Sequence, residues 1–204
     1  LIVPSNEQGA GFMASGYARS TGKPGVVMVT SGPGATNTVT PVRDAMADSI
    51  PMVIICGQVS RQAIGSDAFQ EAPVTSVMGS VAKHVFLVTD ENKLAATLKA
   101  AFEVATSGRP GPVVVDIPKD VQTAEISEED YEDTNISAYS NRILAIEKSR
   151  LNEEKSSEFF THLGNSKRPL IYFGGGVISA SASKELREFV DYFNLPAVST
   201  LMGL

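Results

Sequence analysis

The sequence predicts an α/β fold, with a doubly wound, mostly parallel sheet followed by the start of a second α/β domain. Two observations lead to this class. Short runs rich in β-branched residues alternate with longer stretches whose apolar residues recur at the helical period. The short runs are apolar without alternation, which is typical of strands covered on both faces. Strands alternating with helices in this way indicate βαβ units around a parallel sheet.

Turn-forming residues mark the elements of the first domain. The expected strands are Val26–Thr30, Pro51–Cys56 and Pro112–Pro118. The expected helices between them are Glu7–Thr21, Ala35–Asp48 and Glu91–Ser107. Ser5 and Gln8 have the spacing of a capping box, so the first helix is expected to begin beside them.

A polar segment divides the chain into two expected domains. Residues 1–121 form the first domain. Residues 122–149 are acidic with little periodicity, which is typical of an exposed linker. The α/β rhythm resumes over residues 150–204. Its expected elements are a helix at Leu151–Leu163, a strand at Pro169–Phe173, a tight turn at Gly174–Gly176, a helix at Ser183–Phe193 and a strand at Pro196–Ser199.

Composition and charge argue against several classes of protein. The net charge is −6, with no cluster of basic residues on a predicted helix, so we expect no nucleic-acid partner. No apolar stretch reaches the roughly 18 residues that a membrane span needs. Cys56 is the single cysteine, which excludes an internal disulfide. With only two histidines beside it, the sequence offers no zinc-site pattern.

Glu7 is the first candidate site residue. It falls in the first turn of the first predicted helix, where a carboxylate can simply complement the helix dipole. The residues that follow, Gly9, Ala10 and Gly11, are small enough to let another backbone or a flat ligand approach closely. On the residues alone, a carboxylate that complements the helix dipole and a ligand-binding carboxylate are both open interpretations.

Two further motifs lie where expected strands end. Thr30–Asn37 (TSGPGATN) joins a strand to a helix and can present backbone N–H groups to an anion, but it lacks the GK[ST] ending of a nucleotide-triphosphate loop. A plain tight connection is the alternative. Gly57–Ser60 and Gly65–Glu71 follow the second strand at its carboxyl end, where open α/β sheets build their sites. An ordinary surface loop is the alternative there.

Two last features are weaker. Arg109 lies between turn formers, so it is expected to be a fixed, exposed cation suited to a phosphate or carboxylate. A structural ion pair would explain it equally well. Gly174–Gly176 stands between a strand and a helix, as a dinucleotide loop does, but the G-x-G-x-x-G pattern is absent.

Together these motifs resemble those of the acetohydroxyacid synthase (acetolactate synthase) catalytic large subunit, within the thiamine-diphosphate-dependent enzymes. The segments that carry the resemblance are EQGAG, TSGPGATN, GSDAFQE and ATSGRPGPVVVDIPKDV. It implies a pyrimidine-binding domain up to residue 121 and the start of a central FAD-binding domain. The GDG…N pattern of the domain that anchors Mg²⁺ is not in this sequence, so the resemblance implies that the ligands of Mg²⁺ lie elsewhere and that this piece alone is inactive.

The resemblance implies a reaction and roles for several residues. The reaction is decarboxylation of pyruvate and condensation with a second 2-keto acid, pyruvate or 2-ketobutyrate, in branched-chain amino-acid biosynthesis. Glu7 matches the glutamate that hydrogen-bonds to N1′ of the thiamine aminopyrimidine, for which we expect an apolar pocket and a raised pKa in the assembled enzyme. Phe69 and Gln70 match residues of the substrate channel, and Lys119 matches one at its mouth.

FAD contacts and an inhibitor site are also implied. The residues matched to FAD contacts are Arg109, Gly174, Gly175, Gly176, Thr200 and Leu201. Ser60 and Ala68 match the border of the sulfonylurea herbicide site. Asn6 stands where the family usually has histidine, and Ser60 stands where it has the proline of GQVP. We therefore expect lower sulfonylurea sensitivity than in a proline-bearing relative.

The implied assembly is a homodimer or tetramer with active sites between subunits, and a regulatory small subunit is a candidate partner. The implied location is the cytoplasm, or a plastid or mitochondrion in a eukaryote. Two alternatives are kept. One is an FAD-independent catabolic acetolactate synthase or another thiamine-diphosphate 2-keto-acid decarboxylase. The other is a non-catalytic binding module on the same fold, since fold alone does not fix function.

Overall fold

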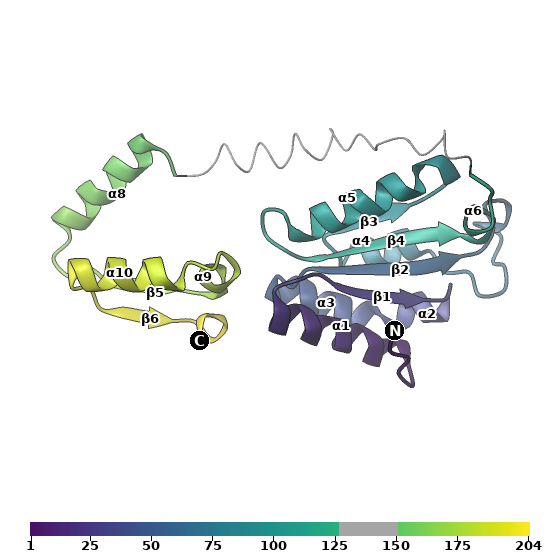
Figure 1. The fold of residues 1–204 in the computed structure, drawn as a ribbon, viewed down its shortest axis with the longest axis horizontal. Helices are drawn as coiled ribbons and strands as arrows, with labels where there is room; N and C mark the ends of the chain where they lie inside the picture. The colour runs from purple at the N-terminus through teal and green to yellow at the C-terminus, as the bar shows by residue number, and fades with distance from the viewer. Residues whose placement is uncertain (127–150) are drawn as a thin grey trace. The chain divides into compact units, whose positions relative to one another are not determined.

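The computed structural model describes residues 1–126 and 151–204 (Figure 1). The chain divides into two compact units, Leu1–Ala145 and Ile146–Leu204. Apart from its first five residues, the linker predicted at 122–149 lies outside the described part of the chain, so the predicted domain boundaries remain predictions. No described helix is long and apolar enough to cross a membrane.

The first unit is built on a four-stranded sheet in which every pairing is parallel (Figure 1). In spatial order the strands are β1 (Gly25–Val29), β2 (Met52–Gln58), β4 (Pro112–Pro118) and β3 (His84–Leu87). Cys56 of β2 stands opposite Asp116 of β4. The parallel α/β class predicted from the sequence is confirmed, while β3 was not among the predicted strands.

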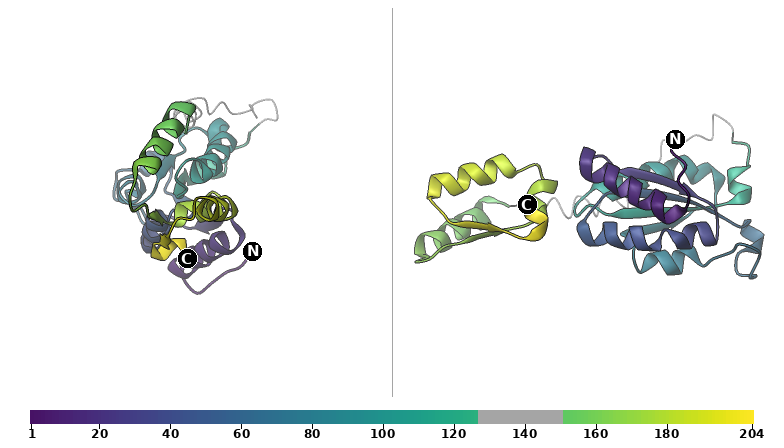
Figure 2. Two further views of the ribbon diagram at one scale, coloured as in Figure 1. Left: turned by 90° about the vertical axis from the view of Figure 1, so that its left-hand side faces the viewer. Right: turned by 90° about the horizontal axis from the view of Figure 1, so that it is seen from below.

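Helices cover both faces of this sheet (Figure 1, Figure 2). The helices packed on one face are α1 (Glu7–Thr21), α2 (Pro33–Asn37), α3 (Val39–Asp48) and α4 (Val74–Gly79). The other face carries α5 (Leu94–Thr106) and the short α6 (Lys119–Gln122). Each layer has its own apolar core. Met52 and Ile54 point into the first core and Val53 into the second, as the two-residue period of a strand requires.

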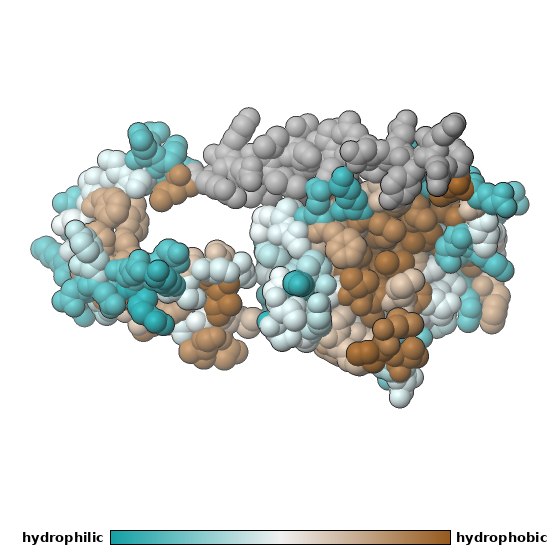
Figure 3. Space-filling model, in the orientation of Figure 1, coloured by the Kyte–Doolittle hydropathy of each residue, from teal (hydrophilic) through white to brown (hydrophobic). Residues whose placement is uncertain are grey.

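One part of the α5 face stays open. Val27 of β1 is buried under the α1 layer, whereas Val26 and Met28 on the opposite face are 46% and 69% exposed. The helix α5 packs on β2, β3 and β4. An apolar surface is therefore visible over the sheet beside α5 (Figure 3).

Two local predictions are corrected. The cap of α1 is Asn6 rather than Ser5, because the Asn6 Oδ1 atom accepts the Gly9 N–H at 2.7 Å. The helix predicted at Ala35–Asp48 is interrupted at Thr38, a buried residue whose hydroxyl bonds back to the Ala35 carbonyl at 2.7 Å. The helix that resumes there has Pro41 in its first turn, where the missing N–H removes no helical bond.

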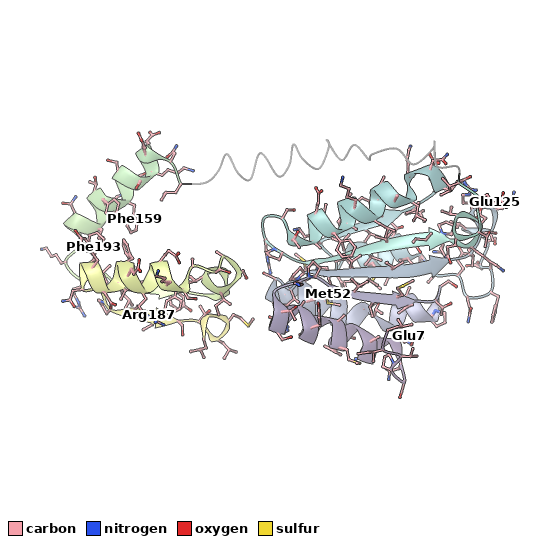
Figure 4. The ribbon with its side chains drawn as sticks, in the orientation of Figure 1. Glu7, Met52, Glu125, Phe159, Arg187 and Phe193 are labelled. Atoms are coloured by element: carbon pink, nitrogen blue, oxygen red, sulfur yellow. The ribbon has the colours of Figure 1, made fainter. Side chains whose placement is uncertain are left out.

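The second unit opens a further α/β arrangement. Its elements are α8 (Glu153–Asn165), β5 (Ile171–Phe173), α9 (Gly175–Ser179), α10 (Ser183–Phe193) and β6 (Ala197–Ser199). The strands β5 and β6 pair in parallel. The predicted turn at Gly174–Gly176 is instead the start of α9. Phe159 and Phe160 of α8 contact Phe189 and Phe193 of α10, with ring centroids 6.0 and 5.8 Å apart (Figure 4).

Candidate cofactor and substrate site

A cavity of about 400 Å³ lies where the carboxyl ends of β1, β2 and β4 meet. Its lining residues are Met28, Val29, Thr30, Ser31, Ile55, Cys56, Gly57, Gln58, Gln70, Ile117, Lys119 and Gln122. Two residues predicted to belong to the substrate channel, Gln70 and Lys119, are therefore brought together. The place is the one where open parallel sheets build their sites.

Glu7 begins α1 and faces the Thr30–Asn37 motif (Figure 4). Its Oε2 atom accepts a hydrogen bond from Asn37 Nδ2 at 3.0 Å. This hydrogen bond holds the pKa of Glu7 below its ordinary value, because it stabilises the ionised carboxylate. The shift in this chain is opposite to the raised pKa expected in the assembled enzyme, since here the carboxylate is solvated and not enclosed by apolar groups.

Glycine is required in the turn between β1 and α2. Gly32 has φ +55°, and a Cβ built on it would lie 2.4 Å from the Gln70 carbonyl oxygen. A Cβ on Gly34 would lie 2.7 Å from the methyl group of Thr30. The turn therefore packs directly against the loop that carries Gln70.

Close packing also fixes the helix that carries Glu7. A Cβ on Gly11 would lie 2.4 Å from Pro41 Cγ, so this glycine lets α3 approach α1. A Cβ on Gly25 of β1 would lie 2.1 Å from the Ala14 carbonyl oxygen. Among the small residues after Glu7, Gly11 thus serves a contact between α1 and α3 inside the fold.

The loop between β2 and α4 carries most of the predicted channel and inhibitor residues. The Glu71 carboxylate accepts the N–H groups of Gly65 and Ala68, and these bonds lower the pKa of Glu71. Phe69 is 90% exposed and does not line the cavity, in contrast to Gln70. Ser60 precedes the short 3₁₀ helix Arg61–Ala63, at the start of this loop.

Ion pairs connect the same loop to the segment that holds Lys119. Arg61 Nε lies 2.6 Å from Asp120 Oδ2, and Arg61 Nη1 lies 3.0 Å from Glu91 Oε2. Asp120 is the second residue of α6, next to Lys119. The ion pair with Asp120 therefore holds α6 beside the start of the loop.

A buried polar cluster beside the cavity was missed in the sequence. Asp116, Gln58 and Cys56 are 1%, 5% and 0% exposed. Gln58 Nε2 donates to Asp116 Oδ2 at 3.1 Å, and Cys56 Sγ lies 3.6 Å from Asp116 Oδ1. Burial raises the pKa of Asp116 to about 6, and it also raises the pKa of the Cys56 thiol. The sequence feature that could have revealed this cluster is the single carboxylate, Asp116, inside the apolar run Pro112–Pro118.

The residues matched to FAD contacts fall in both units. In the first, Arg109 donates from Nε to Ser49 Oγ at 2.8 Å and from Nη2 to the Met46 and Ala47 carbonyls at 2.9 and 3.0 Å. It therefore satisfies carbonyl groups at the end of α3.

In the second unit, Gly174 lies against Thr200, since a Cβ on Gly174 would lie 3.0 Å from Thr200 Oγ1. A Cβ on Gly175 would lie 2.9 Å from the Met202 carbonyl, whereas Gly176 faces open space. Leu201 is 83% exposed. The loops after β5 and β6 thus bring Gly174 and Thr200 together, and nothing in the chain tests their predicted role.

No group of three or more His, Cys, Asp or Glu side chains suited to a metal ion occurs among residues 1–126 and 151–204. The polar side chains that line the cavity carry amides, hydroxyls, the Cys56 thiol and the ammonium of Lys119, and the apolar ones are Met28, Val29, Ile55 and Ile117.

Known proteins resemble the chain along its whole length. It is 47% identical over 203 residues to the acetolactate synthase large subunit of Corynebacterium glutamicum, and 46% identical over 204 residues to acetolactate synthase 3, chloroplastic, of Brassica napus. It is 44% identical over 206 residues to the mitochondrial acetolactate synthase catalytic subunit of Saccharomyces cerevisiae. These alignments cover 100% of this chain and 32%, 30% and 30% of the three relatives. The chain thus spans about a third of the length of the curated relatives it matches.

Family models match both units. Residues 1–80 match the N-terminal TPP-binding domain of thiamine pyrophosphate enzymes, and residues 157–204 match the central domain of the same enzymes. The two matches occur in the order that the sequence motifs imply. With the parallel sheet and the similarity to acetolactate synthases over its full length, the chain belongs to the thiamine pyrophosphate enzymes.

Proposed function

We propose that this chain contributes the pyrimidine-binding glutamate and one wall of the substrate channel to an acetolactate synthase. The observation that carries the proposal is the meeting of Glu7 with Asn37, which joins two of the matched motifs beside the strand ends. The names of relatives 43–47% identical over essentially the whole chain support the same activity. Pyruvate and 2-ketobutyrate are the proposed substrates.

The residues present fit the aminopyrimidine end of thiamine diphosphate. Glu7 offers a carboxylate held by Asn37, and the motif that carries Asn37 packs against the loop that carries Gln70, since a Cβ at Gly32 would lie 2.4 Å from the Gln70 carbonyl oxygen. Thiamine diphosphate, when bound there, would supply a nucleophilic carbon and an electron sink for decarboxylation of a 2-keto acid.

The proposed role of the chain is to prepare that chemistry. The ionised Glu7 carboxylate would accept a hydrogen bond from the aminopyrimidine ring, and Asn37 holds that carboxylate in place. Lys119 offers a positive charge to the carboxylate of an entering keto acid, and Gln70 offers an amide on the same wall.

The other parts of the site belong to the wider protein in this proposal. Mg²⁺ ligands would come from outside residues 1–126 and 151–204. FAD contacts are proposed for Gly174 and Thr200 of the second unit and, separately, for Arg109 of the first. A homo-oligomer would supply the opposite wall, and a regulatory small subunit is the proposed further partner.

The test is acetolactate formation from pyruvate by the full-length protein, with thiamine diphosphate, Mg²⁺ and FAD added singly and together. Activity that requires all three supports the proposal. Activity without FAD would favour the catabolic FAD-independent enzyme. Absence of acetolactate in every combination would refute the proposal.

A matched pair of variants separates catalysis from helix electrostatics. Glu7→Gln is expected to lower kcat by at least about a hundredfold, because general acid–base groups contribute factors of that order. Glu154→Gln removes an exposed carboxylate from the first turn of α8 and should leave kcat unchanged. Equal kcat values in the two variants would remove Glu7 from the mechanism.

A further inference from the structure

The buried cluster of Asp116, Gln58 and Cys56 is the feature that the proposed function leaves without a role. A buried carboxylate is unfavourable unless hydrogen bonds compensate it, so its presence in a strand core calls for a reason. The donors to Asp116 are Gln58 Nε2 and the Cys56 thiol. The register explains how they meet, since Cys56 stands opposite Asp116 and Gln58 lies two residues further along the same face of β2.

The side-chain amide of Gln58 is fixed in one orientation. Its nitrogen donates to Asp116 Oδ2 at 3.1 Å and to the Ala72 carbonyl at 3.0 Å, while its oxygen accepts the Val59 N–H at 2.9 Å. Reversing the amide would place an oxygen against two acceptors. Asp116 and the Ala72 carbonyl together therefore decide which way the amide of Gln58 points.

The bond from Gln58 to Ala72 anchors the end of the loop that holds Gln70. The Glu71 carboxylate closes the same loop by accepting the Ala68 N–H at 3.0 Å. Gln70 has φ +60°, and its carbonyl lies against the Gly32 backbone. Residues 68–72 are thus tied to β2, to the β1–α2 turn and to themselves, and Gln70 is the member that lines the cavity.

We propose that Gln58, oriented by Asp116, is a positioning residue that sets where Gln70 stands in the cavity wall and thereby sets the affinity for the keto acid. This inference rests on the proposed function, in which the cavity leads the keto acid to the cofactor. Gln58 itself lines the cavity, but its amide is engaged by Asp116, the Ala72 carbonyl and the Val59 N–H, so its loss should act through the loop and raise KM much more than it lowers kcat.

The test uses the full-length enzyme with all cofactors. Gln58→Met keeps the side-chain length and removes its three hydrogen bonds, and Asp116→Leu removes one of the two acceptors that orient Gln58. Both are expected to raise KM for pyruvate about tenfold, the effect of losing roughly one buried hydrogen bond, with kcat changed less than threefold. Asp116→Asn keeps an acceptor oxygen for Gln58, so the KM of this variant should stay within about twofold of that of the parent. The control is Gln62→Met, at an exposed glutamine of the same loop.

Hydrogen exchange provides a second measurement that is independent of turnover. In Gln58→Met the amides of residues 65–72 should exchange faster, while those of β4 and α5 stay as in the parent. The inference would be overturned by an unchanged KM in Gln58→Met and Asp116→Leu, or by faster exchange throughout the unit in Gln58→Met. A KM in Asp116→Asn as high as in Asp116→Leu would also overturn it. If the parent makes no acetolactate, the proposed function fails, and the exchange comparison still decides whether Gln58 holds the loop.

Discussion

Glu7 and Asn37 lie thirty residues apart in the sequence, and their side chains meet at 3.0 Å. One belongs to the first turn of α1 and the other ends α2, so the contact forms only when both helices pack on the sheet. This contact lowers the pKa of Glu7, which makes its effect measurable.

Asn37→Ala removes the hydrogen bond that favours the ionised form of Glu7, so the pKa of Glu7 should rise. Because the proposed role needs the carboxylate ionised, the acid limb of the kcat/KM profile should move to higher pH. Thr36→Ala, which removes an exposed hydroxyl one residue away, is the control. Superimposable profiles for the parent and Asn37→Ala would contradict the proposed role of the pair.

Gly11 and Gly16 form a matched pair within α1. A Cβ at position 11 would lie 2.4 Å from Pro41, whereas a Cβ at position 16 meets nothing within 4 Å. Gly11→Ala should therefore destabilise the protein by about 2 kcal/mol through overpacking. Gly16→Ala should stabilise it by about 0.5–1 kcal/mol, since alanine favours the helix. The urea midpoints of the two variants measure these changes in stability. Equal shifts in the two variants would show that α1 and α3 do not make this contact.

Asp116 should impose a pH dependence on stability. Its pKa rises from an ordinary 3.8 to about 6 in the folded chain, so between these values the folded state binds more protons than the unfolded state. Stability then falls as the pH rises through that window, by roughly 3 kcal/mol in total. The Asp116→Asn variant does not titrate in this range. Its free energy of unfolding should therefore rise relative to that of the parent between about pH 4 and 6. Urea unfolding across that range measures the difference, and a constant difference would contradict the buried, hydrogen-bonded carboxylate.

Arg109 should stabilise the first unit whether or not it contacts FAD. Arg109→Ala removes three hydrogen bonds at the end of α3 and should lower the free energy of unfolding by about 1–2 kcal/mol. Ser49→Ala removes one of them and should have about half that effect. FAD affinity, measured by flavin fluorescence, should fall only in Arg109→Ala. Unchanged FAD affinity in Arg109→Ala would limit its role to the end of the helix.

Ser60→Pro should be tolerated. The φ of Ser60 is −57°, within the range that proline imposes, so the backbone need not move. Stability should stay equal or rise by up to about 1 kcal/mol. Inhibition by a sulfonylurea should become stronger, in line with the expectation for position 60. Equal inhibition of the parent and the variant would refute that expectation.

The sequence predicted several long elements to the residue and missed several short ones. The bounds of α1 and β4 agree to the residue, because Gly22 ends the helix in the left-handed region and prolines bracket the strand. The strand β3 has four residues and α4 has six, too few for either period to show. Gly174–Gly176 suggested a turn because glycine disfavours helices, yet packing starts α9 there.

The candidate site could be predicted only as far as its motifs reach. Gln70 and Lys119 were found by their motifs, and both line the cavity. The bond from Gln58 to Asp116 crosses 58 residues and depends on the register of β2 against β4, which no local pattern specifies. Phe69 shows the converse limit, since its motif does not reveal that the side chain points into solvent.

The open face of β1 also leaves a methionine side chain accessible to oxidants. Met28 is 69% exposed there, whereas Met52 and Met78 are 0% and 1% exposed in the core under α1–α4. Peroxide converts accessible methionine into its polar, chiral sulfoxide, and buried thioethers react later. Damage would therefore begin at exposed methionines such as Met28, Met13 and Met202, and at Met28 it would make an apolar surface of the cavity wall hydrophilic while the interior of the sheet remains intact.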